Sequence, residues 1–118
     1  MPRSDVLREK LVRDKIPSII QAERGCELDV DYTKAHPEEM RRLLDLKLRE
    51  EADELVEAKE PIQALMELGD LYAVLECMAR DRGFTMEMIR QEAMLKEEEK
   101  GGFSNRYVLF LNQGGEKL

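Results

Sequence analysis

The sequence predicts a mainly α-helical fold: an antiparallel helical bundle with a small β element. Of the 118 residues, 38% are charged and only 5% are aromatic, and the chain has seven glycines, four prolines and no tryptophan. An all-β protein would need more aromatic residues for its strands and more glycine and proline for its turns. Apolar residues recur at helical spacing between prolines and glycines that can start and end helices. We expect residues 1–118 to form one domain, with flexible ends at 1–9 and 112–118.

The first part of the chain predicts one short helix and one strand. A proline can open a helix over 17–24, and the glycine at position 25 can end it. Over 27–32, acidic and apolar residues alternate, which is typical of a strand with one face in water. Residues 106–111 are apolar and favour strand structure, so we expect a second strand there that pairs with the first.

Three long helices are predicted between these strands. The first begins at Pro37 and runs to about residue 60, where a second proline breaks it. That proline opens the next helix, over 61–82, which a glycine can end. Thr85 is a suitable N-cap for the third helix, and a pair of glycines ends it after residue 100. The short connection at residue 61 predicts that the first two long helices are antiparallel neighbours.

The charge balance argues against several classes of protein. The chain carries 26 acidic and 19 basic residues, a net charge of −7, whereas a general nucleic-acid binder is normally basic. No apolar run approaches the length of a membrane span, and the first residues lack the apolar stretch of a signal peptide. Cys26 and Cys77 match no metal-binding spacing. We therefore expect a cytoplasmic protein without a nucleic-acid or membrane partner.

Two predicted helices place acidic residues where apolar ones are expected. The stripe on the first long helix comprises Met40, Leu44, Leu48, Ala52 and Leu55. On a helical wheel, Glu51 falls in the middle of this stripe and Glu54 on its shoulder. On the next helix, Glu67 falls within the stripe of Ala64, Leu71, Val74 and Met78, and Asp70 lies beside it. The two acidic pairs are therefore expected to face each other.

Four carboxylates directed into one crevice would repel each other, and a cation would resolve the repulsion. Oxygen ligands favour a hard divalent ion, Mg²⁺ or Mn²⁺, which commonly bridges carboxylates and substrate phosphates. Acidic residues are so frequent in this chain, 26 of 118, that such pairs also arise by chance on a solvated surface. The positions within apolar stripes favour the metal site.

Basic residues that could neutralise phosphates occur at both ends of the chain. Lys96 and Lys100 share a face near the end of the third long helix, and Arg13 and Lys15 belong to a basic cluster with Lys10 near the N-terminus. Such groups can stabilise the charge that develops during phosphate chemistry. The alternative, pairing with surface acids, stays equally open at this point.

Three motifs in order resemble those of one enzyme superfamily. The acidic residues read E-E-x-x-E over 50–54 and, after twelve residues, E-x-x-D over 67–70. This pattern resembles the all-α nucleotide pyrophosphohydrolases, which include MazG, the dimeric dUTPases and phosphoribosyl-ATP pyrophosphohydrolase. Residues 10–17, K-L-V-R-D-K-I-P, and the K-x-x-x-K-G-G-F run that begins at residue 96 resemble the opening and ending of a small single-domain branch. The resemblance covers residues 10–111.

The resemblance implies hydrolysis of a nucleoside triphosphate to the monophosphate and pyrophosphate, as house-cleaning or control of the nucleotide pool. It implies Mg²⁺, with Mn²⁺ as a substitute, held by Glu51, Glu54, Glu67 and Asp70. Glu50 is the remaining acid of the motif, and because the helical wheel places it off the apolar stripe, we expect it to support a metal ligand or to orient the attacking water. Glu50, Glu51 and Lys96 form the expected catalytic group. The groups expected to bind the substrate phosphates are Arg13, Lys15, Lys96 and Lys100.

Two alternatives stay open, and an assembly is expected. The chain could hydrolyse phosphoribosyl-ATP in histidine biosynthesis, although the opening motif favours the other branch. It could also be a non-catalytic helical adaptor with the same fold, although the complete acidic set argues against this.

The helix over 61–82 is apolar almost all round, which is typical of a central or subunit-covered helix. Together with the resemblance, this predicts a homo-oligomer, a dimer first and a tetramer as the alternative.

Overall fold

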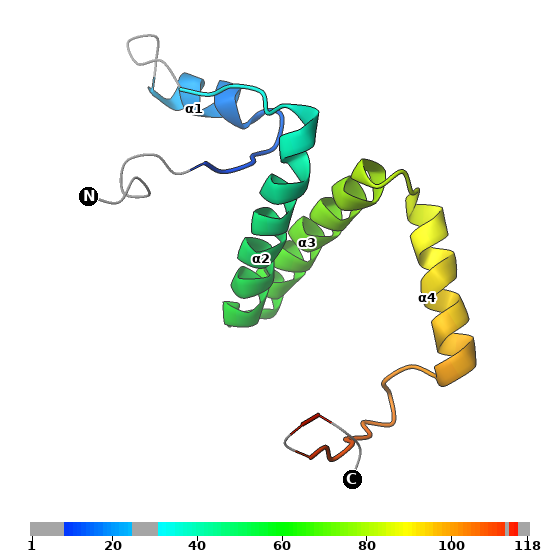
Figure 1. Cartoon of the computed structure of the whole chain (residues 1–118). Helices are drawn as coiled ribbons and strands as arrows, with labels where there is room; N and C mark the ends of the chain where they lie inside the picture. Colours follow the sequence, from blue (N-terminus) through cyan, green and yellow to red (C-terminus); the bar gives the residue numbers. More distant parts are fainter. Residues whose placement is uncertain (1–8, 25–30, 113, 116–118) are drawn as a thin grey trace. The chain divides into compact units, whose positions relative to one another are not determined.

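A computed structural model describes residues 9–24, 31–112 and 114–115 (Figure 1). It contains helix α1 (Ile16–Arg24), the short 3₁₀ helix η2 (Pro37–Glu39), and helices α2 (Met40–Glu57), α3 (Pro61–Asp81) and α4 (Met86–Lys100). The predicted mainly α-helical class is therefore confirmed. None of the described helices combines the length and the apolar character needed to cross a membrane.

The chain forms two compact units, and each is described separately. Residues 1–84 make up the first unit, which carries α1, η2, α2 and α3, and residues 85–118 make up the second, which carries α4. The expectation that the whole chain is one domain stays a prediction. Most of the ends expected to be flexible, residues 1–8, 113 and 116–118, lie outside the described residues.

Helices α2 and α3 pack side by side as an antiparallel hairpin in the first unit (Figure 1). The short connection over 58–60 ends at Pro61, which occupies the start of α3, where its missing N–H removes no helical hydrogen bond. The buried apolar side chains of this hairpin are Leu43, Leu44, Val74 and Ala79. Leu44, only 1% exposed, lies on the predicted inner stripe of α2 and confirms which face of this helix turns inward.

The predicted helix ends agree closely with those in the structure. Gly83, with φ +84°, follows α3, and the Phe84 N–H donates to the Ala79 carbonyl at 2.8 Å. The Thr85 hydroxyl accepts from the Met88 N–H at 3.2 Å, as expected of an N-cap. The two ends of α2 differ from the prediction: Pro37 opens a 3₁₀ turn and the α-helix begins three residues later, and it ends at Glu57 rather than near residue 60.

The predicted β element is not seen in the described part of the chain. Residues 106–110 form no strand, and Arg106 has φ +59°, outside the extended region. The expected partner strand is only partly described: residues 27–30 lie outside the described residues, and Asp31 and Tyr32 form no strand. An apolar run alone is an insufficient signal, because a strand is stable only when a neighbouring backbone takes up its hydrogen bonds.

The outer face of α3 carries large apolar side chains that this unit leaves in water. Ile62, Leu65, Met66 and Tyr72 are 57–65% exposed and lie within about a third of the helix circumference. The sequence shows apolar residues almost all round this helix. In the structure, some of them form the inner face of α3 and the others form its exposed face.

Candidate metal centre

Three of the four predicted metal ligands converge at the α2–α3 contact. Glu51 and Glu54 lie one turn apart on α2, and Glu67 lies on α3. Each offers a carboxylate oxygen, and these oxygens all lie within 4.8 Å of one another. The antiparallel packing of the two helices produces this convergence from residues far apart in the sequence.

Burial separates Glu51 and one oxygen of Glu67 from ordinary surface acids, whereas Glu54 is exposed. Glu51 is only 6% exposed, and its Oε2 atom has no hydrogen-bond partner. The Oε2 atom of Glu67 is also buried and without a hydrogen-bond partner. Buried carboxylate oxygens without a donor are costly, and a cation bound between two of them would reduce this cost. Oxygen-only ligands suit Mg²⁺ or Mn²⁺, and the donor set therefore fits the predicted metal.

The electrostatics of the cluster agree with this interpretation. Burial, followed by the negative charge of Glu54, raises the pKa of Glu51 above its ordinary value. Desolvation and the proximity of Glu67 raise the pKa of Glu54. The charge of Glu54 thus makes ionisation of Glu51 less favourable, and Glu67 does the same to Glu54, an effect that a bound divalent cation would oppose.

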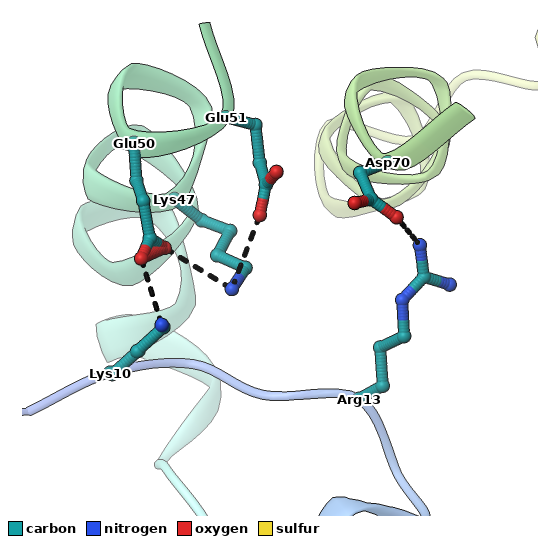
Figure 2. A network of polar contacts seen from close by, with 6 residues as sticks. All are labelled: Lys10, Arg13, Lys47, Glu50, Glu51 and Asp70. Atoms are coloured by element: carbon teal, nitrogen blue, oxygen red, sulfur yellow. Dashed lines mark hydrogen bonds and ion pairs between the residues drawn. The ribbon is translucent and has the colours of Figure 1, made fainter. Parts of the chain in front are cut away.

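Two lysines hold the carboxylate of Glu50, which lies outside the cluster of three acids (Figure 2). The Lys10 Nζ lies 2.8 Å from Glu50 Oε2, and the Lys47 Nζ lies 3.2 Å from Glu50 Oε1. The hydrogen bond from Lys10 is the main reason that the pKa of Glu50 is lowered, and the same contact raises the pKa of Lys10. Lys47 also lies 3.4 Å from Glu51 Oε1.

Asp70, the fourth predicted ligand, is engaged by a cation of the chain itself. The Arg13 Nη2 donates to Asp70 Oδ1 at 2.8 Å, and Figure 2 shows the guanidinium reaching α3 from the segment before α1. Both side chains are partly exposed. Asp70 thus lies one helical turn after Glu67, but it is not part of the cluster of three acids.

The other predicted phosphate-binding residues are not among the residues that make the contacts described above. Lys15 is exposed in the turn before α1. Lys96 and Lys100 are exposed on α4, in the unit that is described separately. Their roles stay predictions.

Sequence reasoning missed Lys47 altogether and gave Lys10 no partner. Lys47 could have been found, because it precedes Glu50 by three residues and Glu51 by four, the spacing at which helical side chains meet. The contact between Lys10 and Glu50 joins residues 40 positions apart, and no local pattern indicates it.

In comparisons with known proteins, no protein-family model, no curated protein and no solved structure matches the chain.

Proposed function

We propose that the protein is a Mg²⁺-dependent nucleoside triphosphate pyrophosphohydrolase that releases a nucleoside monophosphate and pyrophosphate. The observation that supports this most directly is the cluster of Glu51, Glu54 and Glu67, with its two buried carboxylate oxygens that lack partners. The order and spacing of the three sequence motifs support the choice of reaction.

In this proposal, Glu51, Glu54 and Glu67 hold the metal, and Asp70 joins them when Arg13 leaves it. When bound, Mg²⁺ lowers the pKa of a coordinated water and polarises the phosphate that is attacked. The chain contributes the oxygen ligands on two packed helices, which keep their spacing because both helices are anchored by the buried side chains around Leu44.

Glu50 is proposed to orient the attacking water. Its lowered pKa keeps the carboxylate ionised at neutral pH, so that it can accept a hydrogen bond from water. Its side chain is 31% exposed, which leaves it accessible to solvent beside the buried Glu51.

The basic residues are proposed to bind the triphosphate. Arg13 donates from Nη2 to Asp70 Oδ1, and in this proposal its guanidinium moves from the carboxylate to a phosphate, since a guanidinium binds both kinds of anion. Lys15, Lys96 and Lys100 complete the predicted set, with Lys96 assisting the reaction by neutralising charge on the phosphate that is attacked.

One assay separates this function from its alternatives. Purified protein is incubated with Mg²⁺ and a panel of standard and modified nucleoside triphosphates, and pyrophosphate is measured. Release from one or more of them supports the proposal. Release only from phosphoribosyl-ATP indicates the histidine-pathway activity, and no release from any compound indicates a non-catalytic adaptor.

We also propose that the protein acts as a homo-oligomer, in the first place a dimer, in the cytoplasm. The support is the exposed apolar face of α3, because large apolar patches on a soluble domain commonly mark subunit contacts. A second copy on this face would add helices to the α2–α3 hairpin and so complete the helical bundle that the sequence predicts.

A further inference from the structure

Lys47 makes a different set of contacts from the other cations near the acids. It lies on α2, as do both of its partners, so the helix backbone itself fixes their spacing. Its side chain is only 18% exposed, whereas those of Lys10 and Arg13 are 58% and 62% exposed. Lys47 is therefore a fixed part of the hairpin, while the other two reach the acids from an exposed segment of the chain.

The geometry distinguishes the two oxygens of Glu51. Lys47 Nζ lies 3.4 Å from Oε1, while Oε2 is buried and has no hydrogen-bond partner. The same ammonium group lies 3.2 Å from Glu50 Oε1, as Figure 2 shows, so one cation links two consecutive carboxylates. The terminal torsion angle of a glutamate side chain normally has a broad distribution. A contact at one carboxylate oxygen restricts rotation about this bond.

We propose that Lys47 is a positioning residue of the metal centre: its ammonium group holds Oε1 of Glu51 and leaves Oε2 for the metal. This inference rests on the proposed function, because it requires that Glu51, Glu54 and Glu67 bind a divalent cation. Lys47 touches neither the metal nor the substrate in this role, and it acts through the orientation of Glu51 and Glu50. Groups that orient metal ligands in this way commonly change metal affinity by about tenfold or more when they are removed.

A simple charge argument predicts the opposite effect of removing Lys47. A positive charge close to the carboxylates repels a divalent cation, so its removal alone would tighten metal binding. If Lys47 positions Glu51, its removal weakens binding in spite of this electrostatic gain. At a pH where Glu51 is ionised in both proteins, the sign of the change therefore separates a positioning role from a purely electrostatic one.

The test measures Mn²⁺ binding by electron paramagnetic resonance of the full chain, without nucleotide. We expect Lys47→Met to weaken Mn²⁺ binding about tenfold and Lys47→Arg, which keeps the charge and the donors, to restore most of the affinity. Lys10→Met is the matched control: it removes the same charge from Glu50 without touching Glu51, and it should leave the affinity equal or slightly higher. Circular dichroism checks that each variant is folded.

Three results would overturn the inference. Unchanged or tighter Mn²⁺ binding by Lys47→Met would show that Lys47 does not position a ligand, while leaving the metal centre intact. Equal weakening by Lys10→Met would show that the effect is not specific to the contact with Glu51. If Lys47→Met does not fold, Lys47→Gln is used instead, and the same loss of Mn²⁺ affinity is expected. Failure of the unaltered protein to bind Mn²⁺ would overturn the metal centre itself, and this result is distinct from the first two.

Discussion

Glu51 is an ionisable residue at a position where a soluble helix normally carries an apolar one. It is 6% exposed, and Lys47, the cation that contacts it among the described residues, also contacts Glu50. Such a group weakens the fold unless something outside the chain compensates it. Its presence in the hairpin is therefore better explained by a ligand than by stability.

Replacing Glu51 by glutamine tests this explanation. In EDTA, we expect Glu51→Gln to raise the free energy of unfolding by about 1 kcal/mol, because a neutral amide is less costly to bury than a carboxylate. In Mg²⁺, the variant should gain no stability from the metal and show no hydrolytic activity. Urea unfolding with and without the ion measures both effects. A marked loss of stability in EDTA would indicate that Glu51 is a structural residue instead.

The pH dependence of the stability of the unaltered protein and of Glu51→Gln gives a second prediction. The raised pKa of Glu51 means that the folded state binds this proton more tightly than the unfolded state, whose pKa is near 4.5. The contribution of Glu51 to stability is therefore fully present below pH 4.5 and is lost as the pH rises through the raised pKa. The stability gain of Glu51→Gln in EDTA should thus be small near pH 4 and grow toward pH 7. A gain that is independent of pH would contradict the assigned cause.

At the scale of elements, the helices could be predicted because their signals are local. Pro61, Thr85 and Gly101 act within one or two turns of their own positions, and each lies at a helix end in the structure. The strand over 106–111 could not be judged in this way, since a strand depends on a partner elsewhere in the chain. The same distinction applies to the candidate site. Helical periodicity placed Glu51 and Glu67 on the inner faces, but it could not show that Arg13 reaches Asp70.

This contact leads to a prediction about the segment before α1. In the proposed mechanism, Arg13 and a metal ion compete for the Asp70 carboxylate, so Arg13→Ala should bind Mg²⁺ without nucleotide as tightly as the unaltered protein or more tightly. If Arg13 then binds phosphate, the KM for the nucleotide should rise about tenfold, the loss expected for one charge-assisted hydrogen bond. Calorimetry measures the first effect and steady-state kinetics the second.

Arg24→Ala is the control for this prediction. It removes an exposed arginine from the end of α1, outside the contacts of the candidate site that the structure describes. Both the affinity for Mg²⁺ and the KM should stay unchanged. Weaker Mg²⁺ binding by Arg13→Ala in the absence of nucleotide would contradict the competition and would indicate that Arg13 supports the ligand geometry.

At the scale of the whole molecule, the charge and the exposed apolar surface have different consequences. The net charge of −7 would repel a polyanionic substrate. If one Mg²⁺ ion binds to the cluster, its charge of +2 lowers the local repulsion at the place where phosphates would arrive. Most other acids can then be solvated surface. The apolar face of α3 needs a separate explanation, because neither the metal nor the substrate covers it.

A second copy of the chain is the occupant that we propose for this face, and one substitution tests it. Leu65 is 62% exposed near the middle of the α3 patch, and Leu65→Glu would place a charge in a subunit contact. Sedimentation equilibrium at micromolar concentration should give a multiple of 13.7 kDa for the unaltered protein and the monomer mass for Leu65→Glu. Val56→Glu, at an 84% exposed apolar position on α2, is the control and should leave the assembly intact. A monomer in all three samples would contradict the proposed oligomer without affecting the proposed metal centre, because Glu51, Glu54 and Glu67 all lie within one α2–α3 hairpin.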